Sequence, residues 1–293
     1  MKCIFCENDA SFVFRYNKYD IAQCHNCKTT FVMNMPSADE LEDYYSGFNY
    51  AISDKNKEKI LSPHIQKWFE SLNLPKNAKM LDIGGGGGFF SLAFEKFGFG
   101  KATYIDLDNK ACAYAENLGI SRVINNNVTS LLKIEKEKYD FIYCRHVIEH
   151  LIDPRVVIDA GIDLLSKDGI FVLHFPNGRS YERIPDHSHY LDRIDRLTTN
   201  NPQFSTFKKF CILHSEKTSF GLHPKRHLWA ISPKGISLYL QKKKVSFSVN
   251  TYSIDNQCYS PYSPVPSISR RLIHMLYSLP QGKSHLVVNI KRM

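Results

Sequence analysis

The chain has 293 residues, of which 43% are hydrophobic and 23% charged, a balance that excludes disorder over most of its length. It contains no run of about 18 apolar residues, and its N-terminal segment lacks the order of a secretory signal, so we expect a cytoplasmic protein without a membrane span. The formal net charge is +9, but residues 201–293 carry 14 basic and two acidic residues, whereas the first 200 carry 24 basic and 27 acidic. This basic C-terminal part favours an anionic partner, although a solvated lysine surface explains the same excess.

Four of the eight cysteines lie near the N-terminus as two pairs, Cys3-x2-Cys6 and Cys24-x2-Cys27. This spacing is typical of a four-thiolate zinc ribbon, in which two hairpins bring the pairs together around a tetrahedral ion with no open position. We therefore predict a ribbon over residues 1–35 that holds a structural Zn²⁺. Disulfides are the alternative, and a reducing compartment disfavours them.

The next segment, residues 36–75, is predicted to be a helical linker. Ser37 and Glu40 have the Ser-x-x-Glu spacing of a capping box, which predicts a helix over 38–46. Ser62 followed by Pro63 predicts the start of a second helix that ends before Pro75.

Residues 76–293 alternate between strand and helix patterns and are predicted to form the main domain. The expected strands are 79–83, 102–105, 122–125, 139–144, 170–175, 245–252 and 286–290, and the expected helices are 91–97, 110–118, 154–165 and one that begins at Pro233. Such alternation predicts an α/β, doubly wound sheet of seven mostly parallel strands with helices on both faces.

A glycine-rich turn joins the first of these strands to its helix. Its pattern is Asp82-x-Gly84-x-Gly86-x-Gly88, and Asp106 ends the next strand. A dinucleotide loop requires Gly-x-Gly-x-x-Gly or a final Ala, and no register of this turn supplies it. The chain here resembles the class I S-adenosylmethionine-dependent methyltransferases, whose fold is Rossmann-like.

This resemblance implies a role for each residue of the turn. Asp82 would hold the amino group of S-adenosylmethionine, Gly84, Gly86 and Gly88 would let the backbone pass close to it, and Asp106 would accept from both ribose hydroxyls. Asn127 stands where the family usually has an aspartate that accepts from the adenine amino group. Arg145, in a run over 139–154 that is similar to the fourth motif of quinone and sugar methyltransferases, is also assigned to the cofactor site.

The predicted catalytic residues follow the fourth strand. Glu149 and His150 lie where ligands bind in an open α/β sheet, and His150 is the first choice for a base, with helix capping or packing as the alternative. An irregular stretch over about 177–230 is predicted to be a lid insertion over the site. It includes His227, the second base candidate. The metal-like pairs His187-x-His189 and His223-x3-His227 in this stretch also fit ordinary surface histidines.

These patterns together predict a methyltransferase that uses S-adenosylmethionine and acts on a small anionic acceptor. Oxygen methylation of a nucleotide-linked or phosphorylated sugar, or of a glycan intermediate, is the favoured reaction. An RNA methyltransferase is the alternative that the basic C-terminal part would serve. A non-catalytic zinc-ribbon binding protein that retains the cofactor fold is the other.

Overall fold

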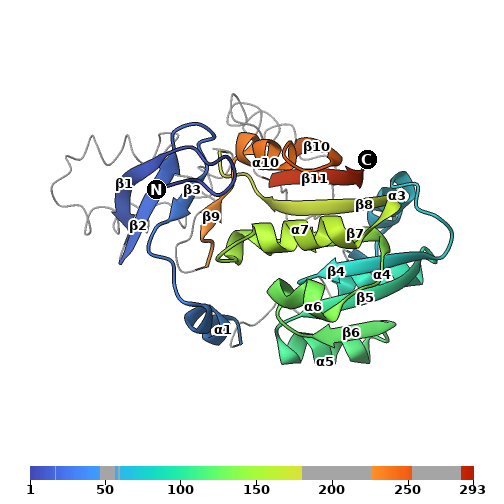
Figure 1. The fold of residues 1–293 in the computed structure, drawn as a ribbon. Helices are drawn as coiled ribbons and strands as arrows, with labels where there is room; N and C mark the ends of the chain where they lie inside the picture. The colour runs from blue at the N-terminus through green and yellow to red at the C-terminus, as the bar shows by residue number, and fades with distance from the viewer. Residues whose placement is uncertain (17, 47–56, 59, 180–225, 253–284) are drawn as a thin grey trace, which may run out of the picture.

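The computed structural model describes residues 1–16, 18–46, 57–58, 60–179, 226–252 and 285–293. Its largest feature is a seven-stranded sheet of order β10-β11-β8-β7-β4-β5-β6 (Figure 1). All neighbouring strands pair in parallel except β11, which is antiparallel to both β8 and β10. The strands are β4 (Ala78–Ile83), β5 (Gly100–Asp106), β6 (Arg122–Asn125), β7 (Tyr139–Arg145), β8 (Leu165–Pro176), β10 (Val245–Tyr252) and β11 (His285–Arg292). The predicted doubly wound fold class is confirmed.

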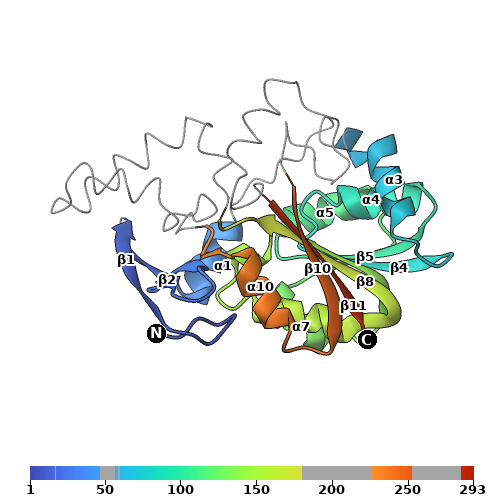
Figure 2. The ribbon, with the colours of Figure 1, turned by 90° about the horizontal axis from the view of Figure 1, so that it is seen from above.

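Helices cover both faces of this sheet (Figure 2). One face packs against α3 (Pro63–Ser71), α4 (Phe89–Lys96) and α5 (Asn109–Asn117), and the other against α6 (Leu131–Ile134), α7 (Arg155–Leu164) and α10 (Pro233–Leu240). Successive strand residues point to opposite faces, so Met80 belongs to the first core and Leu81 to the second. The strands are therefore apolar on both sides, as a covered parallel sheet requires.

The N-terminal cysteine region forms a second, smaller sheet of order β1-β2-β3-β9. Three of its strands are local: β1 (Ala10–Tyr16), β2 (Tyr19–Cys24) and β3 (Thr30–Val32). The fourth, β9 (Trp229–Ala230), comes from the other end of the chain and pairs antiparallel with β3. The buried residues of this sheet belong to the same hydrophobic cluster as α7 and α10, so its core is continuous with one face of the main sheet.

The helices at the domain junction begin as their caps predict. In α1 (Ala38–Ser46), the Glu40 carboxylate accepts from the Ser37 amide at 2.9 Å and the Ser37 hydroxyl accepts from the Glu40 amide at 3.1 Å. This reciprocal pair satisfies two amides at the helix start. The strand predicted over 170–175 is longer in the structure, because β8 begins directly at Leu165, where the predicted helix was to end.

Most of the predicted lid, residues 180–225, lies outside the described residues. The last residues of the predicted lid, Leu228, Trp229 and Ala230, are almost fully buried and belong to the core. Among the described helices, none has the length and apolar character needed to cross a membrane.

Candidate functional site

The glycine turn follows β4 and leads into α4 at the carboxyl edge of the main sheet. Gly84 and Gly88 have φ angles of 66° and 68°, in the left-handed region that favours glycine. A Cβ at Gly84 would lie 2.4 Å from Cγ2 of Val147, just past the end of β7. Gly88 is the residue that precedes α4. The turn therefore runs tightly against the neighbouring strand's end, and its shape depends on glycine at both positions.

The two acids predicted at this turn are buried and hydrogen-bonded. Asp82 accepts from the Ser91 hydroxyl at 2.8 Å, and Asp106 accepts from the amides of Gly86 and Asp108, both at 3.0 Å. Burial raises the pKa of Asp82 to about 7 and also raises the pKa of Asp106. Asp106 thus fixes the glycine turn to β5, and both acids lie where a ligand with hydrogen-bond donors or a positive charge would stabilise their ionised forms.

Asn127 and Arg145 both have protein partners in the structure. The Asn127 side-chain oxygen accepts from the Thr129 amide at 3.0 Å and from its hydroxyl at 2.8 Å, so it caps the short 3₁₀ helix η1 (Val128–Ser130). The Arg145 guanidinium lies over the Phe90 ring, 5.6 Å from its centroid. The cofactor contacts assigned to these two side chains therefore stay predictions.

A cavity of about 890 Å³ extends from the glycine turn across the edge of the sheet. Eight of the predicted site residues line it: Asp82, Gly84, Gly86, Asp106, Asn127, Arg145, His150 and His227. Gly88 and Glu149 are not among the lining residues, because Gly88 is buried at the position before α4 and Glu149 is only 1% exposed. The structure thus brings six of the seven predicted cofactor residues and both predicted bases into one cavity.

Glu149 lies in the 3₁₀ helix η2 (Ile148–His150), between two histidines. Its Oε1 is 3.0 Å from Nδ1 of His146 and 3.8 Å from Nε2 of His150. Its other oxygen, Oε2, is buried with no hydrogen-bond partner among the described residues. Burial raises the pKa of this carboxyl. A buried carboxylate in this position orients a histidine and stabilises its protonated form.

The predicted base His150 is held by neighbouring groups. Its Nδ1 lies 2.8 Å from both the Arg226 carbonyl oxygen and the Tyr45 hydroxyl, and burial lowers its pKa. The His227 ring lies edge-on to it at a centroid distance of 4.7 Å. Glu149, His150 and His227 also offer ligand atoms that lie within 4.8 Å of one another. His223, whose spacing from His227 is also seen in metal sites, lies outside the described residues.

Three further histidines lie at the cavity, and the sequence analysis assigned no role to them. His146 and His285 line the cavity, and His174 contacts both. His146, His174 and His285 pack with ring centroids 5.2 to 5.5 Å apart. They come from β7's end, β8 and β11, so only the strand order brings them together. The signal that sequence reasoning could have used is His146 itself, the first residue after a strand at the ligand-binding edge.

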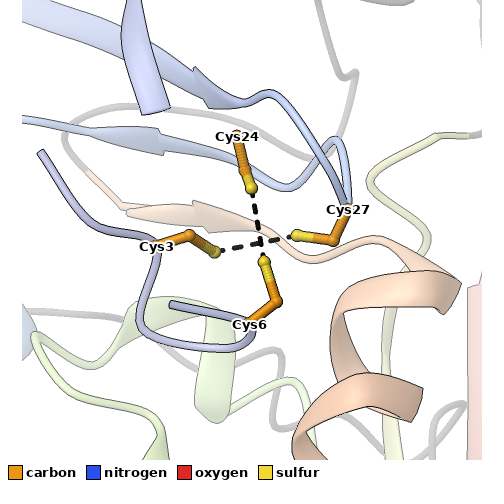
Figure 3. Close-up of side chains that lie close together, drawn as sticks. All are labelled: Cys3, Cys6, Cys24 and Cys27. Carbon is orange, nitrogen blue, oxygen red and sulfur yellow. Dashed lines mark hydrogen bonds between the residues drawn. The ribbon is translucent and has the colours of Figure 1, made fainter. Parts of the chain in front are cut away.

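The four ribbon cysteines point toward a common centre (Figure 3). Their sulfur atoms all lie within 4.8 Å of one another, with Cys3–Cys27 at 3.7 Å and Cys6–Cys24 at 3.4 Å. Zn–S bonds of about 2.3 Å place tetrahedral sulfurs about 3.8 Å apart, whereas a disulfide requires about 2.05 Å. The pKa of the Cys27 thiol is lowered to about 5, first by its hydrogen bond with Cys3. The donor set therefore fits a four-thiolate zinc ion.

Comparison with known proteins finds curated relatives that match part of this chain. The ubiquinone biosynthesis O-methyltransferase of Psychrobacter arcticus is 30% identical over 138 residues, which are 44% of this chain and 53% of that protein. The enzyme of the same name from Actinobacillus pleuropneumoniae serotype 7 is 34% identical over 101 residues, 31% of this chain and 43% of that protein. The match thus spans about half the length of these curated relatives.

A solved S-adenosylmethionine-dependent methyltransferase from Archaeoglobus fulgidus has a TM-score of 0.49 and 17% identity, covering 80% of this chain and 94% of that chain. A family model described as a methyltransferase domain matches residues 54–233, more than half of this chain, and begins after the cysteine ribbon. The chain belongs to this methyltransferase-domain family, which confirms the class of enzyme expected from its sequence.

Proposed function

We propose that this protein transfers a methyl group from S-adenosylmethionine to a hydroxyl oxygen of a small acceptor. The observation that carries the proposal is that one cavity is lined by the glycine turn and Asp106 and also by His146, His150 and His227. A methyltransferase needs a donor site next to a group that can take the acceptor's proton. This cavity offers both.

At the donor end, the chain's own residues fit the ligand. Asp106 would accept from the ribose hydroxyls, and Asp82 would face the amino group, directly or through water. The Gly84–Gly88 turn leaves room for the ligand close to the backbone. The bound donor supplies an electrophilic methyl group on a sulfonium. The roles of Asn127 toward adenine and of Arg145 remain part of this proposal.

At the acceptor end, the cavity wall is largely apolar. Leu41 of α1 and Leu151, Ile152 and Val156 of the η2–α7 region line it, and Ile152 and Val156 are 40% and 41% exposed. Large apolar side chains exposed in a cavity favour an acceptor with an apolar face. The names of the ubiquinone biosynthesis O-methyltransferases support oxygen as the acceptor atom. An anionic group on the acceptor would find Arg226 in the same wall.

The narrower prediction of a nucleotide-linked or phosphorylated sugar, or a glycan intermediate, stays untested. The RNA alternative has less support in the described part of the basic C-terminal region. Lys242 pairs with Glu7 and Lys243 with Asp159, each at 2.7 Å. Cations that are already paired with carboxylates contribute less to phosphate binding.

We further propose that the cysteine ribbon holds one structural Zn²⁺, because four buried sulfurs in tetrahedral reach leave no open coordination position. The ribbon lies outside the residues matched by the family model, so it is an addition to the methyltransferase domain rather than part of its match.

The proposed reaction is tested by measuring S-adenosylhomocysteine formation from S-adenosylmethionine with catechol, caffeate, a uridine-diphosphate sugar and bulk tRNA. We expect turnover with an apolar hydroxyl acceptor and a product that carries the methyl group on oxygen, as identified by mass spectrometry. Turnover with tRNA alone, or methylation only at carbon or nitrogen, would contradict the proposal.

A further inference from the structure

His146 occupies an unusual backbone position at the end of β7. Its φ is 53°, in the left-handed region that non-glycine residues rarely adopt. The strain is maintained by its surroundings, because the His146 amide donates to the His174 carbonyl oxygen at 2.8 Å. Strained residues of this kind are enriched where a side chain must be aimed at a ligand.

The side chain of His146 is fixed by a buried acid. Its Nδ1 lies 3.0 Å from Oε1 of Glu149, which is 1% exposed, while the His146 side chain itself is 28% exposed and lines the cavity. When Nδ1–H donates to the carboxylate, Nε2 carries a lone pair. A histidine oriented by a buried carboxylate in this way is a suitable general base.

The position of His146 also suits proton transfer beside the donor. The next residue, Val147, is the side chain that a Cβ at Gly84 would meet at 2.4 Å. His146 is therefore adjacent in sequence to the residue whose side chain packs against Gly84 of the glycine turn. His150, by contrast, has its Nδ1 shared between Arg226 and Tyr45 and is 11% exposed.

We propose that His146, not His150 or His227, is the general base of the proposed reaction, and that Glu149 orients it. The acceptor hydroxyl gives its proton to Nε2 of His146 as its oxygen forms a bond to the methyl carbon. The carbon–sulfur bond breaks and its electron pair stays on sulfur. The resulting imidazolium is balanced by the Glu149 carboxylate. His150 then acts as a positioning residue that ties α1 to the segment carrying Arg226.

This inference rests on the proposed function, and the test uses a substitution matched to the geometry. His146→Asn keeps a donor near the position of Nδ1, tolerates a positive φ better than most residues, and removes the base. His64→Asn is the control, because His64 is an exposed histidine of α3 that is not among the residues lining the cavity.

We expect His146→Asn to lower kcat with catechol by about 10²- to 10⁴-fold with little change in KM, whereas His64→Asn keeps the wild-type kcat. Binding of S-adenosylhomocysteine, measured by calorimetry, should remain within about threefold of wild type. With 4-nitrocatechol, whose hydroxyl is far more acidic, the loss should shrink, because less proton transfer is needed. A merely structural role would lower turnover of both acceptors equally.

A second measurement does not depend on turnover. Long-range ¹H–¹⁵N spectra of histidine-labelled protein, with the His146 signals assigned by their loss in His146→Asn, should show a neutral ring protonated at Nδ1. A ring protonated at Nε2, full kcat in His146→Asn, or a divalent cation required for turnover would overturn the inference. Failure of the proposed function would instead appear as the absence of S-adenosylhomocysteine binding in the wild type.

Discussion

The hydroxyl of Ser232, at the start of α10, donates to the carbonyl oxygen of Cys27 in the second cysteine pair at 2.5 Å. The Ser232 hydroxyl oxygen also accepts from the Gly235 amide at 2.8 Å, and the Ser232 amide donates to the Thr29 hydroxyl at 3.2 Å. One buried serine therefore joins a ribbon knuckle to a helix of the methyltransferase domain across more than 200 residues of sequence.

We expect Ser232→Ala to lower the free energy of unfolding by about 2 kcal/mol, because it leaves the Cys27 carbonyl and the Gly235 amide buried without their partner. Denaturant unfolding followed by circular dichroism measures this loss. Ser237→Ala is the matched control in the same helix. Its hydroxyl only donates to the Pro233 carbonyl four residues earlier, so a loss of about 0.5 kcal/mol or less is expected. Equal losses in both variants would contradict the role of Ser232.

We expect zinc removal to change the environment of Trp229. The Trp229 ring stacks on the Phe31 ring of β3 at a centroid distance of 5.0 Å, and its indole N–H donates to the Leu151 carbonyl at 2.9 Å. Trp229 therefore lies between the ribbon and Leu151, which is part of the apolar cavity wall at the proposed acceptor end. The chain has two tryptophans, and Trp68→Phe leaves Trp229 as the only one.

In Trp68→Phe, we expect one zinc per chain by metal analysis. Chelation should shift the tryptophan emission to longer wavelength as the β3–β9 pairing loosens, because zinc binding is coupled to ribbon folding. Cys24→Ser combined with Cys27→Ser should abolish zinc binding and give the shifted emission from the start. Complete zinc loss without a spectral change would show that the ribbon does not hold this segment.

Donor binding is expected to release protons near neutral pH. Burial raises the pKa of Asp82 to about 7, so this carboxyl is largely protonated at about pH 6 in the free protein. The ammonium group of S-adenosylhomocysteine favours the ionised carboxylate and lowers that pKa, which releases a proton and makes affinity increase as pH rises toward 7.

Calorimetry at about pH 6 in two buffers of different ionisation enthalpy measures this release. Asp82→Asn should reduce it, because the amide does not titrate. Release of the same number of protons by wild type and variant would contradict the assignment of Asp82 to the amino group of the donor.

The ribose assignment predicts a selective effect at Asp106. We expect Asp106→Ala to weaken S-adenosylhomocysteine binding by at least about 100-fold, since it removes the acceptor for two hydroxyls and the anchor of the Gly86 amide. Asp108→Ala is the control, because Asp108 caps α5 through the Lys110 amide. It should lower stability while changing affinity little. Unchanged affinity in Asp106→Ala would contradict the assignment.

A substitution in the apolar cavity wall at the proposed acceptor end should change only the KM for the acceptor. Val156→Asp places a charge in the apolar wall and should raise KM for an aromatic acceptor by about tenfold, the equivalent of losing the burial of one apolar side chain. Leu132→Asp is the control, since Leu132 is 37% exposed on α6 and is not among the lining residues. An unchanged KM in Val156→Asp would place the acceptor elsewhere.

Local signals in the sequence predicted the elements well. The capping pair of Ser37 and Glu40 and the Ser232-Pro233 start of α10 depend on residues a few positions apart, and the structure confirms both. The strand over 122–125 was also predicted with its observed bounds. The spacing of apolar residues and the identity of helix-capping residues are local properties, so they can be recognised in a single sequence.

The contacts that define the site were harder to predict because they join distant segments. The pairing of Phe31 with Trp229, and the approach of His285 to His146, follow from strand order rather than from any local pattern. His146 was overlooked because its left-handed backbone and its contact with Glu149 are visible only once the end of β7 is placed.

The proposed function requires that the turn beginning at Gly84 binds S-adenosylmethionine. A calorimetric titration of the zinc-loaded full chain with S-adenosylhomocysteine tests it most directly, with NAD and FAD titrated in parallel. We expect a single site of about micromolar affinity for S-adenosylhomocysteine and no heat with either dinucleotide. Binding of a dinucleotide without any response to S-adenosylhomocysteine would contradict it.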